Sequence, residues 1–147
     1  SKMQVNSKIT FFVPDFENPI ETSFISSEIK AGFPSPAADF EESKVSLDHL
    51  LIKNKEATFY AKASGNSMTG AGIDDGDILV IDRSLEPRNN AVAVCFIDGE
   101  FTVKRIKKTD KAVFLMPENP SYAPIQIEPH NEFIIWGIVT YVIKQIK

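Results

Sequence analysis

Cysteine is almost absent from this chain of 147 residues, which contains a single one, Cys95. One cysteine cannot form an internal disulfide, and its isolation suits a reducing compartment. No apolar run reaches the roughly 18 residues that span a bilayer, and no basic-then-apolar stretch at the start is typical of a secretion signal. These absences exclude a disulfide-stapled secreted domain and predict a cytoplasmic protein without a membrane anchor.

Positive charge is also scarce, because 16 lysines and arginines face 20 acidic residues and give a formal net charge of −4. No overall basic field therefore draws the chain to nucleic acid or anionic lipid. The first 45 residues also lack the three amphipathic helices that a small helical DNA-binding module requires. We expect no direct sequence-specific DNA binding.

Histidine, the usual base for a serine nucleophile, occurs only at His49 and His130. His49 belongs to a predicted amphipathic helix and His130 to the polar turn EPHNEF, so we expect a surface or capping role for both. Serine chemistry in this chain therefore requires a different base.

The first stretch of the chain, from Ser1 to about Val45, is rich in proline and shows no sustained period of 2 or 3.6 residues. It is predicted to be a flexible, extended arm outside the core, with a candidate helical turn in the segment AADFEESK. Residues 46–147 are predicted to form the folded domain.

This second region has regular strand patterns. Ser46 is a candidate N-cap for a short helix, LDHLLIK, with Asp48 in its first turn. The pair Asp98-Gly99 is a strong signal for a two-residue hairpin. The dense β-branched run at the end predicts a strand buried on both faces. The expected strands lie within 57–63, 77–82, 91–107 as a hairpin, 111–117 and 133–147. The pattern predicts a mainly β domain of six or seven strands.

A glycine-rich corner, KASGNSMTGAG, presents two serines, Ser64 and Ser67, between two predicted strands. A serine hydroxyl needs a neighbouring base to become a nucleophile. Lys104 lies in the second strand of the predicted hairpin, and an apolar environment would lower its pKa. A neutral Lys104 beside Ser67 would form a Ser-Lys dyad. From these residues alone, a plain loop and an ordinary sheet-edge lysine remain the alternatives.

Three segments taken together, SGNSM, GIDDGDILVID and DGEFTVKRI, resemble the LexA/UmuD family of self-cleaving serine peptidases. The resemblance runs from about Lys30 to the end of the chain. It implies a twisted β-sheet peptidase domain with an extended N-terminal arm. It also implies that Ser67, which precedes Met68, is the nucleophile and that Lys104 is its base, with no metal or cofactor. The missing DNA-binding module favours the UmuD branch.

A further landmark in the arm, AGFPSPAADF, resembles the stretch at which UmuD-branch proteins cut themselves. By this resemblance the scissile bond is Ala31–Gly32. Members of that branch often have Cys-Gly at this bond, whereas this chain has Ala-Gly, as LexA-type members commonly do. Ile29 would then fill an apolar subsite. The backbone N–H groups near Asn66 and Ser67 would stabilise the oxyanion.

The resemblance implies a role in the bacterial SOS response. A RecA filament on single-stranded DNA would stimulate self-cleavage, and the truncated product would serve as the accessory subunit of an error-prone, UmuC-like Y-family DNA polymerase. A homodimer is implied, with the apolar strand FIIWGIVTYVI as a candidate contact. Two alternatives remain: a non-enzymatic β-rich binding module regulated by arm docking, and a signal-peptidase-like enzyme, against which the missing membrane anchor counts.

Two charged clusters and the cysteine have simpler interpretations. The aspartates of the segment IDDGD do not match the spacing of a calcium loop, and we expect them to form a solvated turn. Four basic residues that follow Lys104 are expected on the solvent-exposed face and tip of a hairpin, with a partner-binding patch as the alternative. The aspartates are Asp74, Asp75 and Asp77, and the basic residues are Arg105, Lys107, Lys108 and Lys111. Cys95 is expected to be a small core residue.

Overall fold

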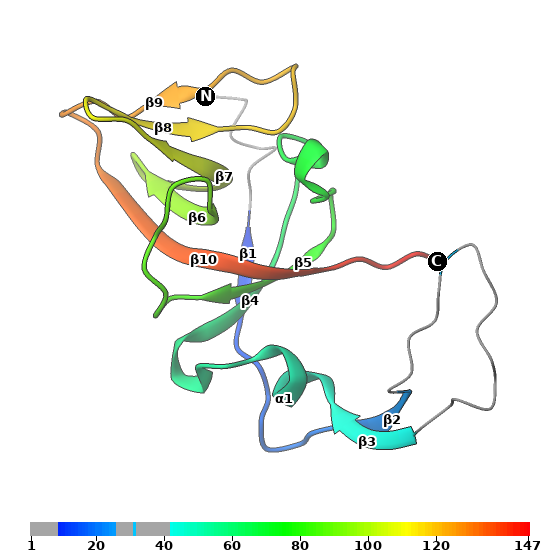
Figure 1. Ribbon diagram of the computed structural model, residues 1–147. Helices are drawn as coiled ribbons and strands as arrows, with labels where there is room; N and C mark the ends of the chain where they lie inside the picture. The colour runs from blue at the N-terminus through cyan, green and yellow to red at the C-terminus, as the bar shows by residue number, and fades with distance from the viewer. Residues whose placement is uncertain (1–8, 26–30, 32–41) are drawn as a thin grey trace. The chain divides into compact units, whose positions relative to one another are not determined.

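The protein is described by a computed structural model that covers residues 9–25, 31 and 42–147 (Figure 1). The chain forms two compact units. The first contains the stretch up to Pro14 together with Asn54–Lys147, and the second is Asp15–Lys53. In the described residues, strands dominate and helices are short, which confirms the predicted mainly β fold class.

The first unit is built on one sheet of eight strands, in the order β1-β4-β5-β10-β6-β7-β8-β9, in which every neighbouring pair is antiparallel. Its strands are β1 (Thr10–Phe12), β4 (Thr58–Lys62), β5 (Ile78–Asp82), β6 (Val92–Ile97), β7 (Glu100–Lys108), β8 (Val113–Met116), β9 (Ile125–Gln126) and β10 (Phe133–Ile143). Two short 3₁₀ helices, η3 (Lys55–Ala57) and η4 (Thr69–Ala71), precede β4 and β5. The strands expected from the sequence are all present in this sheet.

The β6–β7 hairpin turns at Asp98 and Gly99, whose φ angles are 48° and 89°. Both residues are in the left-handed region, as a type I′ turn requires, so the predicted two-residue turn is confirmed. Across the hairpin, Ala93 pairs with Lys104, and Cys95 pairs with Thr102. These four residues therefore lie on one face of the sheet.

The core has two clusters. Cys95 is fully buried in one of them, which confirms its expected place in the core. One cluster contains Ala61, Ala63, Met68, Ile73, Leu79, Ile81, Val94 and Val103; the other contains Ala93, Cys95, Ile106 and Leu115. Because successive residues of β6 and β7 point to opposite faces, the hairpin contributes to both clusters.

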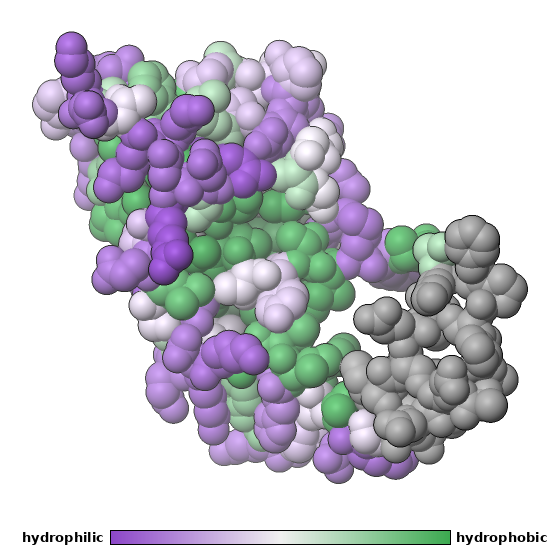
Figure 2. Space-filling model, viewed as in Figure 1, coloured by the Kyte–Doolittle hydropathy of each residue, from purple (hydrophilic) through white to green (hydrophobic). Residues whose placement is uncertain are grey.

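Strand β10 crosses the middle of the sheet and pairs with β5 and β6 on its two edges. The prediction that it is buried on both faces holds only in part: side chains from both of its faces pack against the two core clusters, but Gly137 is its one fully buried residue. Ile134, Tyr141 and Ile143 are at least 40% exposed, and Figure 2 shows apolar surface across the region where β10 runs. A β-branched run indicates a strand that suits a pleated surface, whichever faces are covered.

The start of the chain joins the sheet instead of remaining in an arm outside the core. Residues Thr10–Phe12 pair with β4, and the ring of Phe11 packs against the first core cluster. The Phe11 ring centroid lies 4.5 Å from that of Trp136 and 5.0 Å from that of Phe101. A strand of three residues is too short to give a recognisable period, which explains why the sequence did not reveal it.

The second unit contains β2 (Glu21–Ile25) paired antiparallel with β3 (Glu42–Ser46), followed by α1 (Leu47–Leu51). The predicted helical turn in AADFEESK is wrong for residues 42–44, which are extended. Residues 37–41 of the same segment lie outside the described residues. Across the described part of the chain, no helix is long and apolar enough to cross a membrane.

Ser46 occupies the predicted N-cap position of α1, but its side chain makes no capping hydrogen bond. Its hydroxyl is buried and has no hydrogen-bond partner among the described residues. The helix therefore begins where the sequence predicts, with Asp48 in its first turn, but without the side-chain cap.

Candidate active site

The glycine-rich corner between β4 and β5 is fixed at its base by backbone hydrogen bonds. The N–H of Ala63 donates to the carbonyl of Asp77 over 2.9 Å, and the N–H of Gly76 donates to the carbonyl of Ala63 over 2.8 Å. Gly65 turns the chain with a φ of 94°, a conformation that favours glycine. Met68 is only 3% exposed and holds the corner to the core. Ser67 is therefore presented by a loop fixed on both sides.

Ser67 and Lys104, which are 37 residues apart in the chain, meet at this corner. The Nζ atom of Lys104 lies 3.0 Å from the Oγ atom of Ser67. It also lies 2.6 Å from the Oγ1 atom of Thr102 and 3.2 Å from the carbonyl oxygen of Val103. A neutral amine has two N–H donors and one lone pair. Thr102 and Val103 can accept the two donors, which leaves the lone pair for the hydroxyl proton of Ser67.

The environment of Lys104 favours this neutral form. The side chain is 5% exposed, and burial lowers the pKa of Lys104 from 10.5 to about 8. Cys95 lies nearby on the same face, but burial raises the pKa of its thiol to about 12, so it supplies no anion at neutral pH. Among the described residues, no ion pair involves Lys104. Lys104 can therefore lose its proton near neutral pH.

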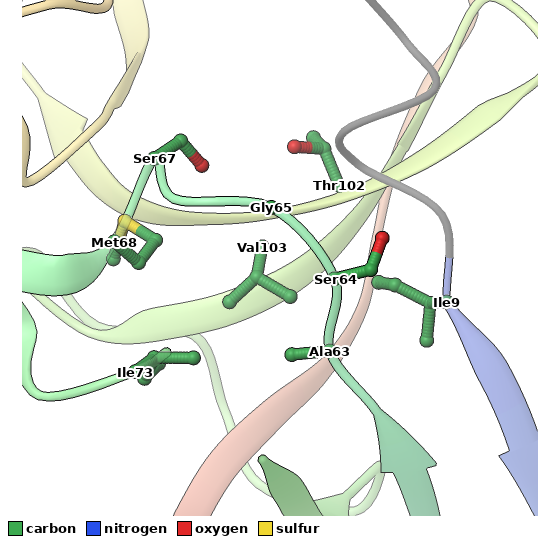
Figure 3. Close-up of a pocket in the computed structure, with 9 residues that line it drawn as sticks. All are labelled: Ile9, Ala63, Ser64, Gly65, Ser67, Met68, Ile73, Thr102 and Val103. Atoms are coloured by element: carbon green, nitrogen blue, oxygen red, sulfur yellow. The ribbon is translucent and has the colours of Figure 1, made fainter. Parts of the chain in front are cut away.

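A small cavity of about 20 Å³ opens beside Ser67. Its apolar walls include Ile9, which precedes β1, and Val103 of β7, and Figure 3 shows Ile9 facing the corner that carries Ser64 and Ser67. This volume holds a water molecule or a methyl group and little more. Both candidate serines, Ser64 and Ser67, line this cavity. The Lys104 amine makes its hydrogen bond to Ser67, which favours Ser67 as the nucleophile.

A larger groove of about 720 Å³ begins at Lys104 and Thr102 and extends along the start of β7. Its opposite side is formed by residues between Ser121 and Asn131, including Tyr122. The lining combines apolar side chains with hydroxyl, amide and carboxylate groups, a mixture suited to an extended peptide. The groove and the small cavity share Thr102; Lys104 lines the groove and Ser67 lines the cavity.

The loop after β8 clamps the corner, a feature that the sequence did not reveal. The N–H of Glu118 donates to the carbonyl of Ser67 over 2.8 Å, and the carbonyl of Glu118 accepts from the N–H of Gly70 over 2.7 Å. The side-chain amide of Asn119 donates to the carbonyl of Asn66 over 2.7 Å. The carboxylate of Glu118 is held by Arg105 at 2.5 Å. The segment PENPS looks only like a turn, because all of these partners are remote in the sequence.

Arg105 therefore differs from the three lysines grouped with it in the sequence. Lys107, Lys108 and Lys111 are exposed, as expected for the wet face and tip of a hairpin. Arg105 is half-buried and binds both Glu118 and the carbonyl of Asn90. It supports the clamp on the serine loop.

The aspartate-rich turn also differs from its expected form. Asp77 is 5% exposed, so the interpretation as a solvated turn is wrong for this residue. Its carboxylate accepts a hydrogen bond from the N–H of Asp74 and pairs with Lys144, which also binds Asp74 over 2.8 Å. Because the carbonyl of Asp77 closes the base of the corner, Lys144 ties the end of the chain to the serine loop.

The other predicted site residues have different positions. No described residue accepts a hydrogen bond from the backbone N–H of Asn66 or Ser67, so both N–H groups are available to an oxyanion within the described part of the chain. Ala31 is described and exposed, whereas Ile29 and Gly32 lie outside the described residues. Both histidines, named above as poor candidates for the base, are exposed.

Comparisons with known proteins bear on the same region. A family model described as Peptidase S24-like matches residues 23–140. Protein MucA of Salmonella typhimurium is 40% identical over 119 residues, which cover 80% of this chain and 81% of MucA. Protein SamA of Salmonella typhimurium strain LT2 is 35% identical over 133 residues, 89% of this chain and 92% of SamA. The LexA repressor of Bordetella avium is 34% identical over 116 residues, 79% of this chain and 54% of the repressor.

Proposed function

We propose, from the premise that this chain belongs to the peptidase S24-like family that includes LexA and UmuD, that it cleaves itself between Ala31 and Gly32 with a Ser67–Lys104 dyad. The observation that carries the proposal is the 3.0 Å contact between the Lys104 amine and the Ser67 hydroxyl, combined with the burial of that amine. A buried lysine without a carboxylate partner is costly to keep charged, and such arrangements concentrate at functional sites.

The proposed reaction is acyl transfer. Neutral Lys104 accepts the Ser67 proton while the serine oxygen attacks the carbonyl carbon of Ala31. The backbone N–H groups of Asn66 and Ser67 hold the resulting oxyanion. Its collapse breaks the bond to the Gly32 nitrogen, which takes the proton from Lys104 and leaves as an amine. Water, deprotonated by Lys104, then releases Ala31 from the serine ester.

The local shapes support this choice of bond. The cavity of about 20 Å³ beside Ser67 suits the methyl group of Ala31, and Gly32 allows the backbone to approach the nucleophile. Beyond Gly32, Pro34 and Pro36 favour an extended segment of the kind the groove beside Lys104 can accept. The separation of 36 positions between Ala31 and Ser67 permits attack within one chain or between two chains.

The test is intact mass spectrometry of the purified full-length protein, with and without a RecA filament on single-stranded DNA. Self-cleavage at the proposed bond gives a fragment of residues 32–147. A fragment with a different N-terminus would contradict the assignment of Ala31–Gly32. A chain that stays whole in every condition would favour the non-enzymatic binding module.

The size of the cavity gives a specificity prediction. Replacing Ala31 by valine is expected to slow self-cleavage by about 10-fold or more, because two extra methyl groups exceed the space beside Ser67. Adding Ile9→Ala should restore part of that rate, since it removes one wall of the cavity. The rates are compared by quantifying the 32–147 fragment over time. No rescue of the valine variant by Ile9→Ala would show that the cavity does not receive residue 31.

Thr102 gives a second prediction. Thr102→Val keeps the shape of a 6% exposed side chain but removes the acceptor 2.6 Å from the Lys104 amine, and is expected to slow self-cleavage about 5-fold. Thr102→Ser retains the hydroxyl and should stay close to the wild-type rate. An equal loss in the serine and valine variants would show that packing, and not the hydrogen bond to Lys104, is what matters. The measurement is again the rate of fragment formation.

For the biological role, the proposal follows the resemblance to the UmuD branch. Residues 32–147 would act as the accessory subunit of an error-prone Y-family DNA polymerase, after cleavage stimulated by the RecA filament. The similarity to MucA and SamA over most of each chain supports this branch.

A homodimer belongs to the same proposal, with its interface at β10. The exposed apolar residues of that strand, Ile134, Tyr141 and Ile143, support this position of the interface. Damage-induced mutagenesis in cells that carry the uncleavable Ser67→Ala chain tests the role.

A further inference from the structure

The edge of the main sheet is occupied by a strand that lies on the departing side of the proposed scissile bond. Strand β1, blue in Figure 1, has three residues, and within the described part of the chain β4 is its one pairing partner. Phe11, at its centre, comes 20 residues before Ala31 in the chain. If self-cleavage releases residues 1–31, the sheet loses this edge strand.

Two apolar side chains, those of Phe11 and of Ile9 just before the strand, hold β1 to the core. The Phe11 ring packs on Phe101 and Trp136, at centroid distances of 5.0 Å and 4.5 Å, and these two rings also contact each other edge to face at 6.0 Å. Ile9 packs against the same core cluster. The neighbouring Phe12 points to the other face, where it is 41% exposed and its ring centroid lies 6.1 Å from that of Tyr60. The apolar contacts of β1 with the core therefore follow a pattern of apolar residue, any residue, aromatic residue.

Loss of β1 would open two complementary features at one place. The outward backbone N–H and C=O groups of β4 that now face β1 would lose their partners, and an open strand edge readily pairs with another extended segment. At the same time, Phe101 and Trp136 would lose the aromatic ring that covers them. Strand addition with one side chain in a pocket is a recurrent mode of peptide recognition.

We propose that this place, defined by the outer edge of β4 together with the aromatic surface that Phe101 and Trp136 form, is a docking site that cleavage opens for an extended segment of a partner protein. The segment has the pattern of Ile9 and Phe11: an apolar residue, one intervening residue and an aromatic residue. The inference rests on the proposed self-cleavage for its timing. The seated β1 is the observation that defines the chemistry of the occupant.

Two other occupants are less suited to this site. A second cleaved copy has no β1 to donate, because it has lost residues 1–31 as well. The released arm loses the high effective concentration that the covalent link provides, and it dissociates on dilution. A three-residue strand that is held by two apolar side chains depends strongly on that link. A partner segment bound by further contacts elsewhere would replace it.

Trp136 provides a direct reporter, because it is the only tryptophan in the chain and its ring contacts Phe11. The receptor is the full-length chain with Ser67→Ala, which prevents cutting, and Phe11→Asp, which places a carboxylate against two aromatic rings and expels β1. The probe is a peptide of residues 8–14, KITFFVP. Because the peptide lacks the covalent link, we expect weak but saturable binding, reached only at peptide concentrations far above that of the receptor, that changes the fluorescence of Trp136.

Three matched controls separate docking from general stickiness. The same peptide with Phe11→Ala should bind at least about 10-fold more weakly, whereas the Phe12→Ala peptide should bind nearly as well as the parent peptide. The Phe12→Asp receptor, whose β1 remains seated, should bind none of the peptides. A cooperative thermal transition of the Phe11→Asp receptor verifies that it is folded.

The outcomes distinguish this inference from the proposed function. No binding of the parent peptide to the folded Phe11→Asp receptor, or equal binding of the Phe11→Ala and Phe12→Ala peptides, would overturn the docking site even if the wild type cuts itself. Self-association of the receptor that excludes the peptide would replace the partner by a second copy and overturn the assignment. If wild-type protein binds the peptide only after cutting itself, self-cleavage opens the docking site. Binding of the peptide to uncut wild-type protein would overturn the claim that cleavage opens it.

Discussion

Full-length protein carrying Ser67→Ala is expected to remain whole under conditions in which the wild-type chain is cut, with the cleavage rate lowered at least about 1,000-fold. Lys104→Met should have a similar effect, because it removes the only base within hydrogen-bond distance of the serine oxygen in the described structure. The two residues act as one unit, so the double variant should be no slower than either single variant.

Matched controls are available in the same two elements. Ser64→Ala removes a hydroxyl from the same loop and from the wall of the small cavity but leaves the dyad in place, so it should still cut. Lys107→Met removes an exposed amine from the same strand and should cut at close to the wild-type rate. Lys104→Arg should be inactive, because a guanidinium stays protonated. The measurement is fragment formation by intact mass. Normal cutting by Ser67→Ala or Lys104→Met would contradict the dyad, and loss of cutting in Ser64→Ala would point to the other serine.

Much of the fold could be predicted because its strongest elements are local. Asp98-Gly99 favours a type I′ turn by its own conformational preferences, and this turn fixes the register that pairs Lys104 with Ala93 and Thr102 with Cys95. Strand β10 was recognisable from its β-branched residues, but the sequence could not show which faces would be covered. Burial depends on what packs over a strand, which a run of apolar residues does not specify.

The candidate site divides in the same way. Ser67 and Lys104 were identified through their motifs, and their meeting follows from two hairpins of one sheet. The residues that hold the serine loop were missed, because Glu118 and Asn119 act through a backbone bond and an amide on remote carbonyls. Contacts of this kind produce no recognisable spacing of residue types in the sequence. Asp77 was misjudged for a similar reason, since its partner Lys144 is 67 residues away.

The pH dependence of self-cleavage follows from the pKa of Lys104, which burial lowers from 10.5 to about 8. At pH 7 roughly a tenth of the amine is neutral, and at pH 9 roughly nine tenths, so the rate should rise about tenfold between these values and then level off. The Cys95 thiol, whose pKa is raised to about 12, stays neutral throughout. Initial rates across this range give the midpoint. A rise that continues to pH 10 or beyond would show an ordinary lysine.

The same shift makes folding stability depend on pH. Below about pH 8 Lys104 is protonated in both the folded and the unfolded chain, and burial of its charge costs about 3 kcal/mol. Between about pH 8 and 10.5 the unfolded chain binds more protons, so this cost disappears as the pH rises. Denaturant unfolding of Ser67→Ala with Lys104 or with Lys104→Met measures the difference. The lysine protein should gain stability relative to the methionine protein across that interval, and a constant difference would mean that the Lys104 amine keeps its usual pKa.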